Sequence, residues 1–250
     1  QQCLVEWLVM PLLCDSSTTF CRLMETILSD IVWNKCLIHQ GDLITFGSSF
    51  KVTLENLKAV FLRLQASNLK VKPQNCRLFQ EKINYQGHEV SEAGLRPSPD
   101  KISALSDWEM PDTLKEVKSF LAFCGHYRMY LPYFSSIAAP LVKLTKRNVK
   151  FDTDNEKCKG AFRKLKEMLL KLPRLNYVTP GAVFQLDTDA SDTSIAGCLS
   201  QLVEIDGHVK EQPIAFASKM LKSRTRNFCS TEKELYAITY FMRYWKDCTD

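Results

Sequence analysis

The chain reads Cys36-Leu37-Ile38-His39-Gln40-Gly41-Asp42-Leu43-Ile44-Thr45-Phe46 over residues 36–46. Two apolar, β-prone runs flank a short polar centre that ends in Gly-Asp, a pattern typical of a tight β-hairpin. The strands of such a hairpin pack on a core and hold the side chains at the tip rigidly. The stretch therefore predicts a hairpin that presents the carboxylate of Asp42 at its tip.

Apolar residues at helical spacing lie on both sides of this hairpin. They predict helices over residues 16–29 and 50–68, the second stopped by Pro73, which cannot continue a helix. Short strands are expected next, at Cys76–Phe79 and Ile83–Val90.

The middle of the chain has helical patterns without strands. Pro97-Ser98-Pro99 interrupts the preceding pattern, and the helical part then extends to about residue 175. Capping-box sequences at Thr113–Glu116 and Thr153–Glu156 predict two helix N-termini in this part.

From Val183 the apolar pattern changes again. The expected strands are Val183–Thr188, Ile195–Val203 and Gln212–Ala217, with a turn at Asp206-Gly207. A third capping box at Thr231–Glu234 predicts a helix N-terminus. This order predicts the first part of a mixed sheet covered by a helix.

Composition excludes several classes of protein. The chain has 250 residues, 45% hydrophobic and 24% charged, enough for one or two globular domains. We find no apolar run near the roughly 18 residues of a membrane span and no leader-like segment, so we expect an intracellular protein, cytoplasmic or nuclear, without a membrane partner. Ten cysteines without a Cys-x-x-Cys pair argue against a zinc ribbon and predict buried free thiols.

The formal net charge is +5. Basic residues gather in three clusters: Lys70, Lys72 and Arg77; Lys143, Lys146, Arg147 and Lys150; Lys219, Lys222, Arg224 and Arg226. Such clusters could line a phosphate backbone, or they could be ordinary solvated faces and helix C-termini.

Five motifs in one order carry a family resemblance. They are Val9-Met10-Pro11 with Thr19-Phe20-x-Arg22-Leu23-Met24; Asn68-Leu69-Lys70-Val71-Lys72-Pro73-x-x-Cys76; Tyr85-x-Gly87-His88 with Ser91-Glu92-x-Gly94; Lys118-Ser119-Phe120-Leu121-x-x-Cys124-x-x-Tyr127-Arg128 with Ala138-Ala139-Pro140-Leu141; and Asp187-Thr188-Asp189-Ala190-Ser191 with Thr231-Glu232-Lys233-Glu234-Leu235. With them, the chain resembles the Pol polyprotein of gypsy-class LTR retrotransposons.

The resemblance implies an α+β fold in three parts. Residues 1–94 would be the C-terminal part of a reverse-transcriptase palm, 95–180 a helical thumb and connection, and 181–250 the N-terminal part of a ribonuclease H-like domain of mixed α/β type. The implied partners are an RNA/DNA template–primer or an RNA–DNA hybrid. The oligomeric state stays open.

The resemblance also implies a polymerase site that is incomplete. The family carries Tyr-x-Asp-Asp at the hairpin, where this chain has His39-Gln40-Gly41-Asp42, so the first carboxylate is missing. The family's nucleotide loop also reads differently here, as Met10-Pro11-Leu12-Leu13-Cys14, and its remaining carboxylate would precede Gln1. Two-metal catalysis needs several oxygen ligands for Mg²⁺, and Asp42 alone cannot hold two ions. Polymerase activity is thus expected to be lost, and Asp42 has the alternative role of a turn residue.

Asp189 and Glu234 match the first two metal ligands of the family's ribonuclease H site. The further Asp residues of that site would follow Asp250, so the nuclease is expected to be incomplete and its Mg²⁺ binding weak. Glu234 has an alternative role as the N3 residue of a capping box.

Nucleic-acid contacts are implied at four further residues. Gly87 and His88 match the primer-grip hairpin, and Lys72 and Arg77 lie where template phosphate would pass. A His beside a Gly is also a common turn sequence.

Three functions therefore remain open. The chain could be a fragment of an RNA-directed DNA polymerase with ribonuclease H, decayed in activity; a domesticated non-enzymatic scaffold that binds nucleic acid or protein; or a product of a decayed gene without a stable fold. Whether the chain is an enzyme stays uncertain.

Overall fold

A computed structural model describes residues 16–39, 41–147, 149–205 and 207–249. The chain divides between Gln80 and Glu81 into two compact units. The α+β class expected from the sequence is confirmed. Among the described residues, no helix is both long enough and apolar enough to cross a membrane.

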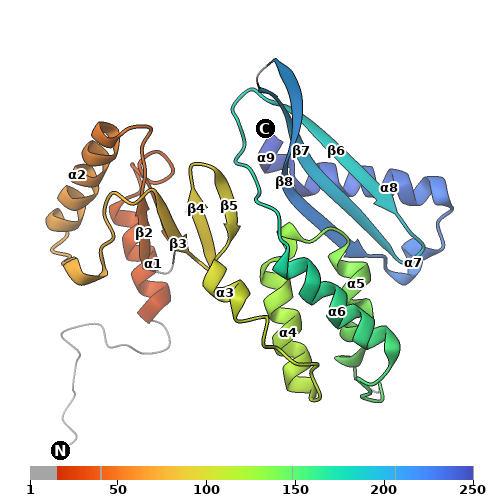
Figure 1. Cartoon of the computed structure of the whole chain (residues 1–250). Coiled ribbons are helices and arrows are strands. Elements are labelled where there is room, and N and C mark those ends of the chain that lie inside the picture. The colour runs from red at the N-terminus through yellow and green to blue at the C-terminus, as the bar shows by residue number, and fades with distance from the viewer. Residues whose placement is uncertain (1–15, 40, 148, 206, 250) are drawn as a thin grey trace, which may run out of the picture. The chain divides into compact units, whose positions relative to one another are not determined.

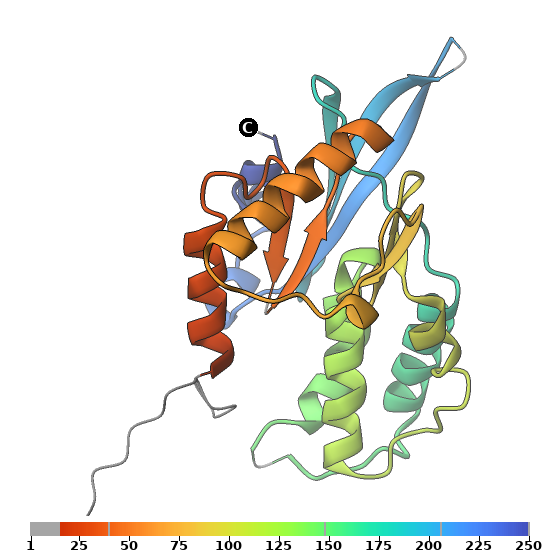
Figure 2. The same ribbon diagram turned by 90° about the vertical axis from the view of Figure 1, so that its left-hand side faces the viewer.

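The first unit contains the predicted hairpin. Its elements are α1 (Ser16–Ile27), β1 (Cys36–His39), β2 (Asp42–Thr45), α2 (Phe50–Ala66) and the short 3-10 helix η1 (Pro73–Asn75). β1 and β2 pair antiparallel, with His39 opposite Asp42 at the end of the ladder. Figure 2 shows α2 lying across one face of this hairpin. The buried residues between these elements are Met24, Leu28, Ile31, Cys36, Val60 and Leu64.

Local hydrogen bonds fix where α2 begins. The side chain of Ser49 accepts a hydrogen bond from the Val52 backbone N–H, which satisfies one unpaired donor of the first helical turn. The Asn56 side chain donates to the Phe46 carbonyl at 2.7 Å, so α2 is tied to the chain that leaves β2. The helix expected to run to residue 68 ends at Ala66.

Two strand predictions in this region were wrong. Residues Cys76–Phe79 follow η1 as irregular chain with no strand pairing. The expected single strand Ile83–Val90 is two strands, β3 (Lys82–Tyr85) and β4 (His88–Ser91), because Gln86 and Gly87 both have positive φ and turn the chain. β5 (Gly94–Pro97) completes an antiparallel sheet in the order β3-β4-β5.

The helical middle follows this sheet in the second unit. It consists of α3 (Pro99–Ser103), α4 (Leu114–His126), the 3-10 helix η2 (Arg128–Tyr130), α5 (Phe134–Leu144) and α6 (Glu156–Leu170). The core at these helices includes Phe120, Tyr127, Tyr130, Leu141 and Leu165, none of which is more than 2% exposed. The short helix α3 was not expected from the sequence.

The predicted caps of two helices can be compared directly with the structure. The Thr113 capping box of α4 is confirmed: its hydroxyl accepts from the Glu116 N–H at 3.2 Å, and the Glu116 carboxylate accepts from the Thr113 N–H at 3.4 Å. The Thr153 box was wrong. Asn155 caps α6 instead, because its side chain accepts from the Lys157 N–H at 2.9 Å.

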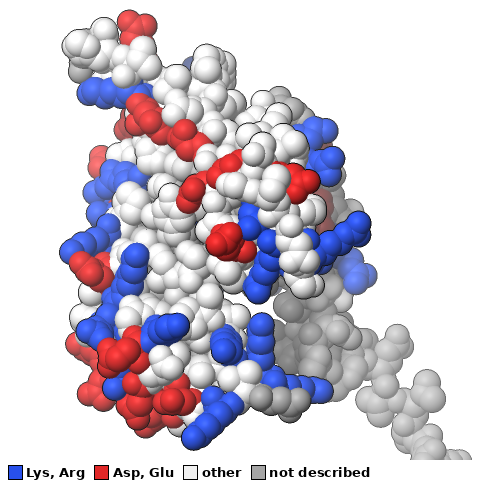
Figure 3. Space-filling view, turned by 90° about the vertical axis from the view of Figure 1, so that its right-hand side faces the viewer, with Lys and Arg blue, Asp and Glu red and all other residues white. Residues whose placement is uncertain are grey.

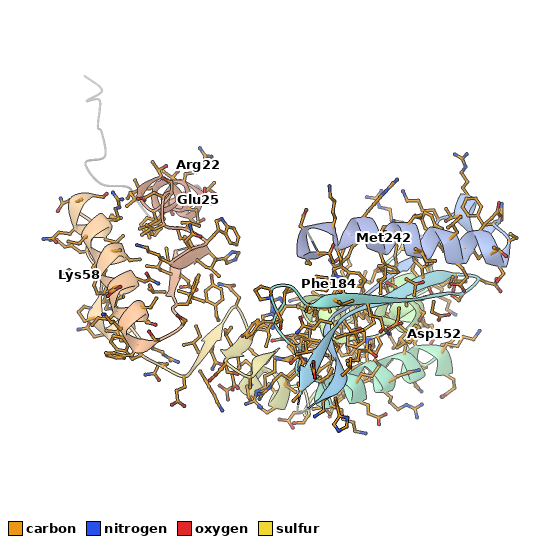
Figure 4. All side chains as sticks on the ribbon, turned by 90° about the horizontal axis from the view of Figure 1, so that it is seen from above. Arg22, Glu25, Lys58, Asp152, Phe184 and Met242 are labelled. Carbon is orange, nitrogen blue, oxygen red and sulfur yellow. The ribbon has the colours of Figure 1, made fainter. Side chains whose placement is uncertain are left out.

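The C-terminal part of the second unit is a three-stranded antiparallel sheet with a helix on one face. Its elements are β6 (Val183–Ala190), β7 (Ser194–Ile205), β8 (His208–Met220), α7 (Ser223–Arg226), α8 (Ser230–Tyr244) and α9 (Lys246–Thr249). Figures 1 and 4 show α8 along one side of this sheet and the helices of the middle part on the other. Phe184, labelled in Figure 4, packs against the buried cluster under α8 that includes Phe241.

The third capping box was also wrong. α8 begins at Ser230, and the Glu232 carboxylate accepts from the Cys229 N–H at 2.8 Å. With Thr231 as its cap, the helix would begin at Glu232. It begins two residues earlier, at Ser230, so Glu234 is not an N3 capping residue.

Residues 174–179, which we call the strap, connect the two sheets of the second unit. Leu175 exchanges two backbone hydrogen bonds with Leu95 of β5, at 2.8 and 2.9 Å. The Asn176 N–H donates to the Pro213 carbonyl of β8, and the buried Gln201 of β7 donates to the carbonyl of Tyr177 at 2.9 Å. The strap therefore joins β5 to β7 and β8 through specific hydrogen bonds.

The cysteine prediction was partly wrong. All eight cysteines in the described ranges are free thiols, as expected. Cys36, Cys124 and Cys158 are buried, but Cys229 and Cys248 are exposed.

Candidate nucleic-acid interface and metal site

The hairpin tip places Asp42 on the surface, opposite His39. Gly41 beside it has a φ of +95°, a backbone conformation that side chains with a Cβ rarely adopt. A Cβ added there would also lie 3.5 Å from the ring of Phe20 in α1, which is ordinary contact. The backbone, rather than lack of space, therefore favours glycine at this tip.

Lys72 and Arg77 flank η1 and are both exposed. The Lys72 carbonyl accepts a hydrogen bond from the Cys76 thiol at 3.4 Å, so a local turn holds this segment. The two basic side chains remain on the surface of the first unit. Their role in nucleic-acid contact stays a prediction.

The β3–β4 turn is held from beneath by α4 and η2. The carbonyl of Gly87 accepts hydrogen bonds from the Tyr127 hydroxyl at 2.9 Å and from the Ser98 N–H at 2.8 Å. A Cβ on Gly87 would lie 3.0 Å from that hydroxyl, and its φ is +79°. Glycine is therefore required both by the turn and by the close approach of Tyr127.

His88 faces this packing. Its Nδ1 lies 3.0 Å from the hydroxyl of buried Tyr130, and its ring stacks on that of His126 at 5.1 Å between centroids. Burial, together with the neighbouring His126, lowers the pKa of His88 below its ordinary value. The lowered pKa favours the neutral imidazole, which acts within the turn as a hydrogen-bonding partner. Its contact with nucleic acid stays a prediction.

Asp189 lies near the end of β6, where side chains alternate between the two faces of the sheet. Phe184, Leu186 and Ala190 pack in the core under α8, so the exposed Asp187 and Asp189 belong to the opposite face. Being next to the last residue of the strand, Asp189 lies at the β6–β7 turn.

Glu234 is half-buried on the flank of α8 that is nearer to β6. The other flank is identified by Tyr240, whose ring lies 3.9 Å from the Nζ of Lys219 in the outer strand β8. Tyr236 shares that flank, and Glu234 lies two residues before it, about 200° around the helix. Glu234 therefore belongs to the side of α8 that faces β6.

An ion pair joins the β6–β7 turn, which follows Asp189, to the beginning of α8, which carries Glu234. The Nζ of Lys233 lies 2.8 Å from Oδ1 of Asp192 in the β6–β7 turn. This contact lowers the pKa of the Asp192 carboxyl, first through its hydrogen bond and then through the charge of Lys233. It places the beginning of α8 beside the turn that follows Asp189. Neither partner is indicated by a local sequence pattern of its own, although Lys233 lies inside the Thr231–Leu235 motif.

The donor set for a metal ion is small. Within the described ranges, no group of three or more His, Cys, Asp or Glu side chains is placed to hold a metal ion. Mg²⁺ can bind through one or two carboxylates while it keeps most of its waters. Asp189 and Glu234 are therefore suited in kind, but not in number, to hold a divalent ion, and Asp42 supplies only one carboxylate.

The basic clusters are spread over the surface. On the face of the molecule drawn in Figure 3, Lys and Arg are interspersed with Asp and Glu. In the third cluster, Lys219 lies over the Tyr240 ring, and Arg226 donates through Nε to the Leu221 carbonyl at 3.0 Å. These two cations are engaged within the chain itself.

Comparison with known proteins shows which family this chain resembles. The family described as the RNase H-like domain found in reverse transcriptase matches residues 155–250, from α6 onward. The Pol polyprotein of transposon 297 from Drosophila melanogaster is 34% identical over 236 residues, which cover 94% of this chain and 22% of that protein. The chain is homologous to retrotransposon Pol polyproteins.

Two further Pol polyproteins are similar to this chain. Those of transposons 412 and gypsy, both from Drosophila melanogaster, are 30% and 28% identical and cover 91% and 90% of this chain, which spans 18% and 22% of their lengths. The chain thus spans about a fifth of the relatives it matches. Residues 155–250 are therefore similar to an RNase H-like domain.

Solved structures show the same fold. A foamy viral protease–reverse transcriptase in complex with double-stranded DNA matches with a TM-score of 0.77 at 20% identity, covering 93% of this chain and 40% of that one. The foamy viral protein in complex with an RNA/DNA hybrid matches with a TM-score of 0.74 at 19% identity, covering 93% and 31%. The fold of this Pol region is therefore that of a reverse transcriptase with RNase H.

Proposed function

We propose that this Pol region binds a template–primer duplex or an RNA–DNA hybrid but does not itself polymerise DNA. The observation that carries the proposal is Gly41, which occupies the hairpin tip where the resemblance calls for a carboxylate. Its φ of +95° matches glycine and disfavours an aspartate. Homology to Pol polyproteins and a reverse-transcriptase fold support the duplex as the ligand.

The nuclease site, like the polymerase site, is expected to lack some of the carboxylates that it needs. Asp189 belongs to the face of β6 opposite to α8, which carries Glu234. Within the described ranges, no group of three or more His, Cys, Asp or Glu side chains is placed to hold a metal ion, so a bound Mg²⁺ would keep most of its waters. When bound, the ion would supply charge stabilisation at a phosphate. Hydrolysis of a hybrid by this chain alone is expected to be undetectable.

A second candidate is a domesticated, non-enzymatic scaffold. The packing favours it over a chain without a stable fold, because the residues beneath the altered hairpin remain tightly packed: Cys36 and Val60 are fully buried. A missing carboxylate above an intact core is what loss of catalysis with retained binding would leave.

Primer extension tests the loss of polymerase activity. The purified chain should not extend a primer on an RNA template with Mg²⁺ or Mn²⁺. Gly41→Asp should not rescue it, because the new residue needs a strained backbone and Asp42 would still lack other ligands. Extension above a heat-inactivated control, by either protein, would overturn this part of the proposal.

Salt dependence tests the binding itself. If the chain neutralises about four phosphates, log affinity falls with log salt at about −3.6, roughly 150-fold between 50 and 200 mM salt. Fluorescence anisotropy with a labelled duplex measures this slope. Lys72→Ala and Arg77→Ala should each reduce the magnitude of this slope by about one. Because the ammonium group of Lys219 lies over the Tyr240 ring, Lys219→Gln should leave the slope unchanged. An affinity independent of salt would favour a protein-binding scaffold.

A further inference from the structure

The β3-β4-β5 sheet has a polar face that points away from the helical core. Neighbouring strands pair Asn84 with Glu89, and Glu89 with Arg96, so these three side chains lie on one face of the sheet. Lys82 lies two residues before Asn84 in β3 and shares that face. Leu95, on the alternate position of β5, packs against the helical core, so the polar face is the outer one.

An ion pair holds one guanidinium on this outer face. Nη2 of Arg96 donates to Oε2 of Glu89 at 2.8 Å, and Nε of Arg96 lies 2.8 Å from Oε1 of Glu89. The Glu89 side chain is only 12% exposed, whereas that of Arg96 is 38% exposed. The carboxylate therefore engages the Nε–Nη2 edge of the guanidinium and leaves the N–H donors of Nη1 outside this contact.

The strap brings a third cation to the outer face. Cγ and Cδ of Arg174 lie 3.2 and 3.3 Å from the position that a Cβ on Gly94 would occupy, and Gly94 shares the outer face with Arg96, two residues along β5. Within the described ranges, Arg174 and Lys82 form no ion pair with a carboxylate. We call these three cations the basic face: Lys82, Arg96 and Arg174.

The carboxylate among these cations is ionised. The hydrogen bond from Arg96 lowers the pKa of the Glu89 carboxyl, against the opposing effect of burial. The charges of Lys82 and Arg174 lower this pKa further. One carboxylate among three cations leaves an excess of positive charge on the face, which an anion would complement.

We propose that the basic face binds a phosphodiester group of the duplex backbone, and that Glu89 holds the Arg96 guanidinium in position for it. This inference rests on the proposed function and names the place of one backbone contact. A guanidinium suits such a ligand, because its fork of N–H donors matches the oxygens of a phosphate. His88 alternates with Glu89 along β4 and turns inward, so this sheet meets the backbone through its outer face.

A formed site and general attraction of a basic protein predict opposite effects of two substitutions. Arg96→Lys keeps the charge but loses the fork of donors, so it weakens a formed site and leaves general attraction unchanged. Arg163→Gln removes the charge of an exposed arginine of α6, whose Nη2 lies 3.4 Å from the Glu156 carboxylate. It weakens general attraction and leaves the basic face intact.

Fluorescence anisotropy with the full chain and a labelled RNA–DNA hybrid measures affinity as a function of salt. Lys82→Gln and Arg174→Gln change exposed side chains and should fold as the wild type does. Arg96→Gln alone would leave the buried Glu89 carboxylate unpaired, so the double variant Glu89→Gln/Arg96→Gln is used in its place. Circular dichroism reports whether each variant is folded.

We expect the double variant to bind about tenfold more weakly, with a salt slope shallower by about 0.9, the value for one phosphate. Arg96→Lys, Lys82→Gln and Arg174→Gln should each weaken binding by about threefold or more. Arg163→Gln should bind as the wild type does.

Two results would overturn the site while the proposed function stands: salt-dependent binding of the hybrid that no substitution in the basic face weakens, or binding that Arg163→Gln weakens and Arg96→Lys does not. A wild type that does not bind the hybrid would overturn the proposed function and this inference with it.

Discussion

Gly94→Ala should strongly destabilise the second unit. A Cβ at this position would lie 2.3 Å from the carbonyl oxygen of Leu175 in the strap, and Gly94 has a φ of +117°. The left-handed backbone alone costs about 1–2 kcal/mol for a residue with a Cβ, and the overlap adds about 1–3 kcal/mol. We expect the free energy of unfolding to fall by about 2–5 kcal/mol in urea denaturation.

Two alanine substitutions separate these contributions. Gly181 has a φ of +78° with no atom within 4 Å of an added Cβ, so Gly181→Ala should show the backbone cost alone. Gly160 lies inside α6, also with open space, so Gly160→Ala should stabilise the chain by about 0.5–1 kcal/mol. If Gly94→Ala costs no more than Gly181→Ala, the close approach of the strap to β5 is not present in solution.

The second large effect is expected at Phe241, which is fully buried between α8 and the sheet. Phe241→Ala should lower the free energy of unfolding by about 3–5 kcal/mol, because it removes a large apolar side chain and leaves a cavity. Tyr244→Ala on the same helix, where the side chain is 48% exposed, should cost much less. Chemical denaturation followed by circular dichroism measures both changes.

Gly197 provides a sharper form of this test. A Cβ on Gly197 of β7 would lie 2.8 Å from Cδ2 of Phe241, so Gly197→Ala should be destabilising by itself. In the Phe241→Ala background the added methyl group would enter the new cavity, and Gly197→Ala should become neutral or stabilising. The coupling of the two substitutions should be about 1–3 kcal/mol, and simple additivity would contradict this packing.

The elements that could be predicted from the sequence are those fixed by neighbouring residues. The hairpin at residues 36–46 depends on alternation and a Gly-Asp turn, and the Thr113 cap depends on a partner three residues away. The strand predicted at Cys76–Phe79 failed because a strand needs a partner, which no local pattern supplies. The cap of α8 failed because Cys229 is not among the usual capping residues.

The contacts of the candidate site lie beyond such patterns. The Lys233–Asp192 pair joins residues 41 positions apart, and the Tyr127 hydroxyl reaches a carbonyl 40 positions away. The motifs indicated where Asp189, Glu234 and His88 would be found, but not that His88 turns inward to Tyr130. Which side chains meet depends on the packing of whole elements, and sequence spacing carries little of that information.

The hydrogen bonds of the strap limit which parts of this chain could be exchanged as separate units. The family boundary at residue 155 separates α6 from α5, yet Ser218 of β8 accepts a hydrogen bond from the Ser135 N–H of α5, and Phe216 packs against the helical core. Leu175 in turn completes the edge of β5. A gene exchange that replaced only residues 155–250 would have to supply matching partners at all three places. Inheritance of the RNase H-like part is therefore constrained by the helical segment that precedes it.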